Sequence, residues 1–400
     1  MKANKIIIVG GGNAGLSVAA QLLRKDSHLD IKIIDPSEKH YYQPAWTLVG
    51  AGIFDVKKTI RNEKDFTPKG TNWIKDAVAE FLPDENKLIC KSGAAYQYDV
   101  LIVCPGIQIN WQQIKGLKET LGKHEVSCNY SVDLAPYTWE IIKNFKGGNA
   151  VFTNPSTPIK CGGAPHKIMY LACDYWRKRG ILDKTNVYYI SGGSVIFGIP
   201  EYAETLQNVI KDDNIHPVYK SNIIEIDGPN KRIYYEQKDE AGVTLKKDLK
   251  FDMCHVVPPQ SAPDFIKNSP LADAKNPYGY VEVDMHTLQH IRYPNVFSLG
   301  DSSNAPCSKT GAAIRKQAPV VVQNVLSFLN DQPVTVHYGG YSACPIPTKY
   351  GKLMLAEFDY TNKPTMTFPF NQAKPRWTMW LLKTKVLPWL YWHKILKGTA

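Results

Sequence analysis

Short apolar runs alternate with amphipathic stretches at the start of the chain. Residues 6–9 read Ile-Ile-Ile-Val, which is typical of a strand buried on both faces. Residues 16–23 then have the pattern of a helix, and residues 31–34 that of a second strand. This order predicts a βαβ unit and an α/β fold with parallel sheets.

A glycine-rich turn joins the first strand to the helix. Residues 10–15 read Gly-Gly-Gly-Asn-Ala-Gly, which matches G-x-G-x-x-G. Gly10 permits the tight turn, Gly12 lets the backbone approach a pyrophosphate, and Gly15 lets the helix pack on the strand. Asp35 ends the second strand and is placed to accept a hydrogen bond from a ribose hydroxyl. Together these features predict a dinucleotide-binding domain.

Two later segments favour FAD over NAD as the dinucleotide. Residues 98–106 resemble the strand that closes the FAD domain of two-dinucleotide flavoproteins, although they end in Cys-Pro-Gly instead of the usual Ala-Thr-Gly. Residues 294–301 end in Gly300-Asp301 and resemble the late strand whose acid binds the flavin ribityl chain. Alternatively, Asp301 caps a helix that begins at Ser302.

A second glycine-rich turn, in the middle of the chain, departs from the fingerprint. The apolar strand at 186–190 leads into Ser191-Gly192-Gly193-Ser194-Val195-Ile196. Ser191 replaces the first glycine and Ile196 the third, and a β-branched residue there prevents close helix–strand packing. We expect the fold of this second domain to be kept and nicotinamide binding to be lost. The electrons must then come from another donor.

Two of the eight cysteines lie in rigid loops. None of the eight form a C-x-x-C pair, so the pattern excludes zinc-ribbon and thioredoxin-like sites and predicts no metal centre. Cys161 lies beside Lys160 and Lys167, just before a helix that Pro165 opens, and we expect its pKa to be lowered. Cys344 lies in a second loop, bounded by prolines. For any single cysteine, a small buried apolar side chain remains the alternative.

The size and charge of the chain limit the kinds of partner that it can have. The chain has 400 residues and 45.0 kDa, enough for two domains, and its net charge of +11 indicates an anionic partner or a generally solvated basic surface. The first strand begins so early that we expect no signal peptide, and no stretch is apolar enough to span a bilayer.

The end of the chain is basic and rich in tryptophan. After Asp359 it has no acidic residue. One face of a first short helix is predicted to hold Trp377, Trp380, Leu381 and Leu387. A second helix, which Pro388 begins, is predicted to hold Trp389, Trp392 and Leu396 on one face. This pattern suits a bilayer interface better than a nucleic-acid groove. The alternative is a helix pair packed on the protein's own core.

The sequence resembles the sulfide:quinone oxidoreductases, in the subgroup that includes the mitochondrial enzymes. The most diagnostic match is residues 38–52, EKHYYQPAWTLVGAG. Further matches are 106–108, 161–171, 287–290, 300–301, 308–310 and 355–360.

The resemblance implies two Rossmann-like dinucleotide-binding domains of the FAD/NAD-linked disulfide-reductase type, plus a C-terminal amphipathic membrane foot. The FAD domain is expected to be split over 1–115 and 280–330. Residues 116–279 form the degenerate second domain, and 331–400 hold the second redox cysteine, the quinone site and the foot.

The resemblance also implies the chemistry. Hydrogen sulfide attacks a redox pair formed by Cys161 and Cys344 and leaves a persulfide, electrons pass through FAD to a membrane quinone, and a sulfane-sulfur acceptor removes the sulfur. Which cysteine carries the persulfide stays open. Cys128 lies where some branches have a third functional cysteine, and we expect it not to be essential. The protein is expected to be peripheral on a bacterial or mitochondrial inner membrane, with no nucleic-acid partner.

The cofactor contacts expected from the motifs and the resemblance are Gly10, Gly12, Asn13, Ala14, Gly15, Asp35, Gln43, Val78, Gly106, Gly300, Asp301 and Lys309. Lys309 is expected at the pyrimidine edge of the flavin, unless it is an exposed loop lysine. Expected quinone contacts are Ile346, Tyr391 and Trp392. The rival functions are an NADH:quinone oxidoreductase of similar architecture and a non-catalytic flavoprotein that binds proteins.

Overall fold

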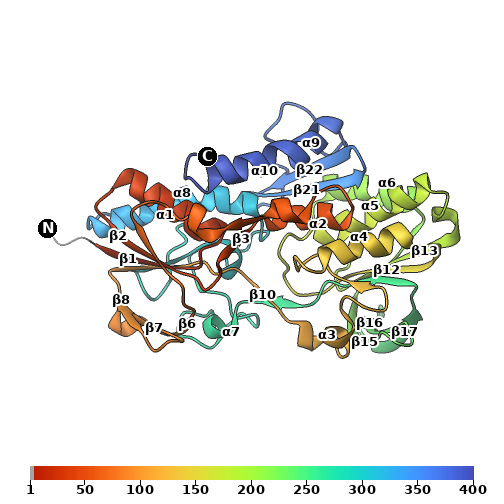
Figure 1. Cartoon of the computed structure of the whole chain (residues 1–400), viewed down its shortest axis with the longest axis horizontal. Helices are drawn as coiled ribbons and strands as arrows, with labels where there is room; N and C mark the ends of the chain where they lie inside the picture. The colour runs from red at the N-terminus through yellow and green to blue at the C-terminus, as the bar shows by residue number, and fades with distance from the viewer. Residues whose placement is uncertain (1–3) are drawn as a thin grey trace.

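The chain forms two lobes, each built around a five-stranded sheet of parallel strands (Figure 1). The computed structural model describes residues 4–400. A two-stranded antiparallel ribbon of β10 (Gln108–Ile109) and β19 (Gln260–Ser261) carries the chain out of the first lobe and back into it.

The first sheet has the strand order β20-β9-β1-β2-β5, and its strand pairs are parallel. The strands are β1 (Lys5–Val9), β2 (Asp30–Ile34), β5 (Thr71–Ile74), β9 (Val100–Val103) and β20 (Val296–Ser298). Helix α1 (Asn13–Lys25) follows β1, which confirms the predicted strand, turn, helix and strand. Because β20 comes after the whole second lobe, this sheet is built from two distant parts of the chain. The domain limits themselves stay a prediction.

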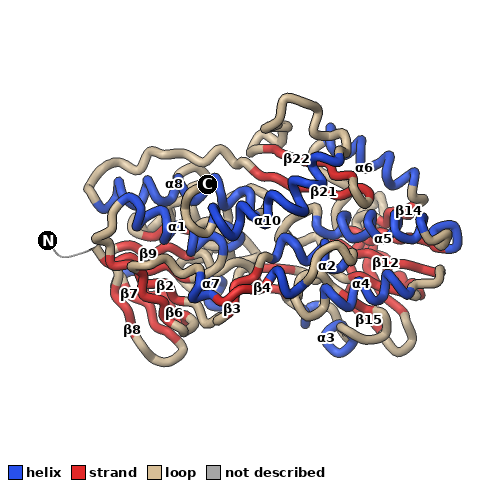
Figure 2. The backbone as a smooth tube through the Cα atoms, turned by 45° about the horizontal axis from the view of Figure 1, so that its top comes forward, coloured by secondary structure: helices blue, strands red, loops and turns tan. Residues whose placement is uncertain are grey.

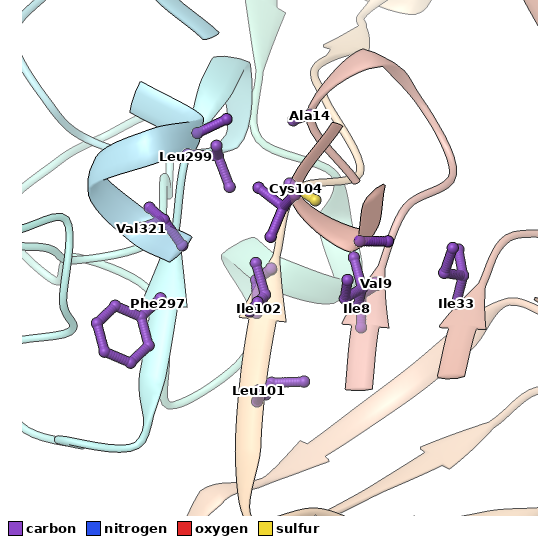
Figure 3. Packing of buried hydrophobic residues seen from close by; sticks show 14 of the residues in the cluster. Ile8, Val9, Ala14, Ile33, Leu101, Ile102, Cys104, Phe297, Leu299 and Val321 are labelled. Atoms are coloured by element: carbon purple, nitrogen blue, oxygen red, sulfur yellow. The ribbon is translucent and has the colours of Figure 1, made fainter. Parts of the chain in front are cut away.

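Apolar side chains fill the space between this sheet and its helices. Figure 3 shows Ile8, Ile102 and Phe297 on three neighbouring strands, with Val321 of α8 (Gly311–Leu329) beside them. Each such fully buried side chain stabilises the fold by roughly 1.5–3 kcal/mol. This packing fixes the carboxyl ends of the strands, where the glycine turn and Gly300 follow.

The second sheet has the order β11-β18-β12-β13-β14 and is also parallel. Its strands are β11 (Val126–Ser127), β12 (Gly148–Asn154), β13 (Thr185–Ser191), β14 (Ile215–Val218) and β18 (Met253–His255), and its helices are α4 (Ala135–Asn144), α5 (Ala164–Lys178) and α6 (Pro200–Asp212). The predicted second Rossmann-like fold is therefore confirmed.

Smaller elements surround the two sheets. One three-stranded sheet consists of β6 (Val78–Leu82), β7 (Lys87–Cys90) and β8 (Ala95–Gln97), and another of β15 (Ser221–Asp227), β16 (Arg232–Lys238) and β17 (Thr244–Lys250). Strands β3 (Lys39–Tyr41) and β4 (Ile60–Asn62) form a pair, and the short helices are α2 (Trp46–Gly50), α3 (Leu117–Thr120) and α7 (Asp264–Lys267).

The C-terminal region lies across both lobes. The hairpin β21 (Ser342–Lys349) and β22 (Lys352–Phe358) packs against α5 of the second lobe. Helices α9 (Trp377–Leu381) and α10 (Leu387–Leu390) follow, with π-helical turns at Leu382–Val386 and Tyr391–Ile395. Figure 2 shows α10 running toward α1 and α8 of the first lobe. Among the described residues, no helix combines the length and the apolar composition that crossing a membrane requires.

The predicted single face of Trp389, Trp392 and Leu396 is wrong. Trp389 is 52% exposed, whereas Trp392 is 7% and Leu396 1% exposed, and the latter two belong to the core of the first lobe. The π-helical turn after Leu390 rotates successive residues by less than an α-helix does, so Trp389 and Trp392 separate. The exposed apolar side chains of this region are Trp377, Val386 and Trp389.

Candidate active site

Cys161 occupies a strained position between β12 and α5. Its φ is +58°, in the left-handed region that residues other than glycine rarely adopt. The backbone N–H of Cys161 donates to the carbonyl of Lys309 at 2.7 Å, and its own carbonyl accepts from Ala164 N at 2.7 Å. These two bonds hold the cysteine at the entrance of α5 and tie its loop to the first lobe.

Cys344 of β21 lies beside Cys161, although the two are far apart in sequence. The two thiols are within hydrogen-bonding reach of each other. The loop that follows Cys161 contains glycines, which let β21 approach it closely. A Cβ built on Gly163 would lie 3.6 Å from the Cβ of Cys344 and 3.2 Å from the Cδ1 of Ile346. Ser308 Oγ lies 3.9 Å from Cys344 Sγ. Both cysteines are present as free thiols.

The pKa values of the two thiols shift in opposite directions, so Cys161 is the member that ionises first. The hydrogen bond from Cys344 lowers the pKa of Cys161 well below its usual value, and the ammonium of Lys167, 2.9 Å from Cys161 Sγ, lowers it further. The same hydrogen bond, together with burial, raises the pKa of Cys344. The expected lowered pKa of Cys161 is therefore confirmed. Lys160, also expected to act on Cys161, donates a hydrogen bond to Gln43 Oε1 and is close enough to Cys161 for a charge interaction.

A second buried lysine, Lys383, reaches the thiol pair from the C-terminal region. Burial, and then repulsion from Lys167, lowers the pKa of Lys383 to about 7, while the two cysteine sulfurs act in the opposite direction. Its Nζ donates to the carbonyl of Pro44 at 2.9 Å. No local pattern in the basic C-terminal segment indicates that the side chain of Lys383 turns inward.

The first glycine turn fits a dinucleotide. Gly10 has a φ of +105°, and a Cβ there would lie 2.6 Å from Cys104 O. A Cβ on Gly15 would collide with Gly10 O, whereas Gly12 faces open space with no atom within 4 Å of its built Cβ. Asn13 and Ala14 begin α1. The N-cap residue is Gly12, so no side chain caps the first N–H groups of the helix. Such an open cradle at a helix N-terminus suits a pyrophosphate.

Asp35 lies beside this turn. Its two carboxylate oxygens accept from Gly11 N at 2.6 Å and from Ser37 N at 2.8 Å. The side chain therefore stands at the carboxyl end of β2, where the fingerprint places an acid for a ribose hydroxyl.

The late Gly-Asp segment approaches the same region from β20. Gly300 has a φ of +72°, and Ala14 Cβ would lie 3.7 Å from a Cβ on it. Asp301 follows in a short 3₁₀ turn, and burial raises its pKa while Lys160 and Lys309 lower it. Asp301 does not cap a longer helix, because the turn ends at Ser302.

Lys309 is buried, so the alternative of an exposed loop lysine is wrong. Its Nζ donates to Ser303 O at 2.9 Å and lies 3.7 Å from the ring centre of Tyr280, and burial lowers its pKa to about 8. Helix α8 begins two residues later, at Gly311, with Thr310 as its N-cap. A lysine and a helix N-terminus thus lie together, as expected for a flavin edge.

Three expected cofactor contacts lie around this framework. Gly106 has a φ of +89° and open space beside it. Gln43 is bonded to Lys160. Val78 is buried in β6, and its role stays a prediction.

Cys128 is fully buried after β11. Its sulfur accepts from Tyr130 N at 3.4 Å, and burial raises its pKa to about 12. The nearby apolar cluster has Ile159 and Val257. This thiol is protonated and shielded, which suits a packing role.

The three expected quinone residues occupy two places. Ile346 is buried beside Gly163 and the thiol pair. Tyr391 and Trp392 pack instead against His40, with ring centres 5.7 Å away in each case. A shared quinone site stays a prediction.

The second glycine turn does not reproduce the pyrophosphate-binding arrangement of the first. A Cβ on Gly192 would meet the backbone nitrogen of Ser156, and Ile196 is buried in the core. Helix α6 begins only at Pro200, so no helix N-terminus follows the turn directly. This geometry agrees with the expected loss of nicotinamide binding.

Comparisons with known proteins agree with this site. The family model described as pyridine nucleotide-disulphide oxidoreductase matches residues 4–134. The mitochondrial sulfide:quinone oxidoreductase of Dictyostelium discoideum is 48% identical over 396 residues, covering 98% of this chain and 86% of the relative. That of Mus musculus is 42% identical over 394 residues, with the same shares covered. The X-ray structure of the sulfide:quinone oxidoreductase from Aquifex aeolicus has a TM-score of 0.80 at 18% identity, covering 99% of this chain and 92% of that one.

Proposed function

This chain belongs to the sulfide:quinone oxidoreductase family, and we propose that it oxidises hydrogen sulfide at the Cys161–Cys344 pair and delivers the electrons through FAD to a membrane quinone. The observation that carries the proposal is the contact between these two thiols, with the ammonium of Lys167 at 2.9 Å from Cys161. Two neighbouring cysteines, one of them partly exposed and with a lowered pKa, form the arrangement that thiol–disulfide exchange requires.

The reaction starts from the oxidised pair, in which the two sulfurs are bonded. Hydrosulfide attacks one sulfur and breaks the S–S bond, so that one cysteine becomes a persulfide and the other leaves as a thiolate. Lys167 stabilises the thiolate because it already donates to Cys161. The electron pair that leaves with this thiolate is the pair that sulfide has supplied. A nucleophilic acceptor then takes the outer sulfur of the persulfide.

The first lobe supplies the cofactor site. When bound, FAD accepts the electron pair and passes it on to a quinone. Gly10, Gly12 and the N-terminus of α1 bind its pyrophosphate, and Asp35 its ribose. Asp301 and Lys309 bind and orient the ribityl and ring portions. The bond between Cys161 N and Lys309 O keeps the thiol loop beside this ring site.

The C-terminal region supplies the membrane contact. Trp377, Val386 and Trp389 expose apolar surface, and the neighbouring basic residues Lys385, Lys394 and Lys397 are exposed as well. Tryptophans with lysines on one exposed surface suit an anionic bilayer interface. The protein is then peripheral on a bacterial or mitochondrial inner membrane, and the relatives in Dictyostelium discoideum and Mus musculus are named as mitochondrial.

A steady-state assay tests the proposal. The purified protein should reduce a soluble quinone when sulfide and a nucleophilic sulfur acceptor are both supplied, and it should not do so with NADH. Quinone reduction by NADH without sulfide would contradict it and would favour the NADH:quinone alternative.

A further inference from the structure

Glu63, His40 and Tyr391 form a buried chain of hydrogen bonds. His40 Nδ1 lies 2.9 Å from Glu63 Oε2, and His40 Nε2 lies 2.6 Å from the hydroxyl of Tyr391. Each of these groups can take part in a hydrogen bond in either tautomer of the imidazole, because the phenol can donate or accept, and His40 joins the carboxylate to the phenol in both cases. Glu63 and His40 come from adjoining parts of the β3–β4 pair, whereas Tyr391 lies in the last π-helical turn.

The second carboxylate oxygen of Glu63 has no partner in this chain. Oε1 is buried, and no group of residues 4–400 forms a hydrogen bond with it. It points at the glycine turn, because a Cβ built on Gly11 would lie 2.6 Å from Oε1 and 3.1 Å from the Cβ of Asp35. Burial, and to a smaller extent Asp35, raises the pKa of Glu63. A buried acceptor without a donor, beside the turn that holds the dinucleotide, calls for a donor from the ligand.

The end of the chain packs on the helix that follows this turn. Ser17 of α1 donates to the carbonyl of Ile395 at 3.1 Å. A Cβ on Gly398 would lie 2.9 Å from Gln21 N, and Leu396 is 1% exposed in the core of the first lobe. The C-terminal helix is thus docked on the same structural unit that binds the pyrophosphate.

We propose that Glu63 is a further cofactor-binding residue, whose Oε1 accepts from a ribose hydroxyl at the adenosine end of FAD, and that His40 and Tyr391 couple this contact to docking of the C-terminal helix. With the ribose bound, Glu63 is held in place and orients His40 for its hydrogen bond with Tyr391. Without it, the carboxylate moves toward solvent and the bond to Tyr391 is lost. The inference rests on the proposed FAD site but not on the sulfide chemistry.

The coupling reaches the redox site, because the docked segment also has Lys383. Lys383 lies close enough to Lys167 and Cys161 for charge interactions with both. Adenosine binding at one end of the first lobe therefore helps to hold the Lys383 side chain beside the thiol pair.

Nucleotide fragments test the coupling in the wild-type protein. Apo-protein is mixed with FAD, ADP or FMN, each at a concentration that calorimetry shows to be saturating. Hydrogen–deuterium exchange is then followed in peptides covering 382–396. FAD and ADP should each slow this exchange about fivefold or more, and FMN, which lacks the adenosine, should not. If ADP leaves the exchange unchanged, or if FMN slows it as much as ADP, the inference is wrong.

Conservative variants test the residues. Because coupling is reciprocal, Tyr391→Phe and Glu63→Gln should each raise the Kd for FAD about fivefold and speed exchange in 382–396 of the holo-protein. Tyr202→Phe is the matched control, since Tyr202 is a buried tyrosine whose hydroxyl donates to Glu357 O in the other core. Unchanged Kd and exchange in both variants would contradict the coupling alone. Apo-protein that binds no FAD would contradict the FAD site itself.

Discussion

The ammonium of Lys167 lies 2.9 Å from the sulfur of Cys161, and both side chains are held by the first turn of α5 and the loop before it. The lysine is buried, and the thiolate in turn raises its pKa despite the burial. Charge on one partner thus supports charge on the other, which gives Cys161 a nucleophilic sulfur at neutral pH.

Lys167→Met should raise the pKa of Cys161, because it removes a positive charge that stabilises the thiolate. We expect the pH at which iodoacetamide alkylation of the reduced protein reaches half its maximal rate to move upward, because less of Cys161 is then thiolate at low pH. The pH profile of alkylation, with Cys161 located by peptide mass mapping, provides the measurement. Lys178→Met, which changes an exposed lysine of the same helix, is the control. Equal profiles for both variants would show that Lys167 does not set the pKa.

Cys128→Ala should retain FAD and most sulfide-dependent activity. Its thiol is fully buried with a pKa raised to about 12, so it is neither ionised nor accessible. Acid denaturation of the wild type should release free FAD, which the absorbance of the supernatant reports. A rate that falls about a hundredfold, equivalent to roughly 2.7 kcal/mol of barrier, would make Cys128 part of the site.

The local motifs of this fold could be predicted from the sequence. The turn at Gly10 to Gly15 requires particular residue types at neighbouring positions, so it can be recognised as a motif in the sequence. The pattern therefore predicted β1, α1, β2 and the place of Asp35 correctly. The departure of the second turn from the fingerprint could be recognised for the same reason, since Ile196 stands where the fingerprint requires a glycine.

Contacts between distant segments could not be predicted from residue patterns. The meeting of Cys161 with Cys344 came only from the family resemblance. Lys383 and Glu63 were missed, because nothing local distinguishes a lysine or glutamate that turns inward from an exposed one. Trp392 was assigned to the wrong face, because α-helical periodicity does not hold through a π-helical turn.

Lys383 should make the stability of the folded protein depend on pH. Its pKa is about 7 in the folded protein and near ~10.4 in the unfolded chain. Between these values the unfolded chain binds more protons, so the free energy of unfolding rises with pH, by up to roughly 1.4 kcal/mol per pH unit. Below the folded pKa both states are protonated and the dependence ends.

Lys383→Met should remove this dependence. From about pH 8 to about pH 9, we expect urea denaturation to show the wild type gaining roughly 1 kcal/mol relative to the variant. Lys385→Met, at an exposed position of the same turn, should keep the wild-type slope. A Lys383→Met variant that also keeps it would mean that Lys383 remains charged in the folded protein.

Membrane binding should depend on the exposed tryptophans and not on the whole segment. Because Tyr391, Trp392 and Leu396 are core residues, deletion of the segment would damage the fold as well. We expect Trp377→Ala combined with Trp389→Ala to lower co-sedimentation with anionic liposomes about tenfold or more, since each indole loses its apolar contact with the interface.

Val243→Ala is the control for this experiment, because it changes an exposed apolar side chain at the far edge of the second lobe. The flavin spectrum checks that each variant is folded. Undiminished sedimentation of the double variant would place the membrane contact elsewhere on the protein.

Anaerobic reduction of the flavin by sulfide tests the central claim most directly. In a stopped-flow experiment, sulfide should bleach the flavin absorbance of the wild type, NADH should not, and a soluble quinone added afterwards should restore it. Cys161→Ser and Cys344→Ser should each retain FAD but show no bleaching by sulfide, whereas Cys90→Ser, at a buried cysteine at the end of β7, should behave as the wild type. Bleaching of either active-site variant at the wild-type rate, or bleaching of the wild type by NADH and not by sulfide, would contradict the account.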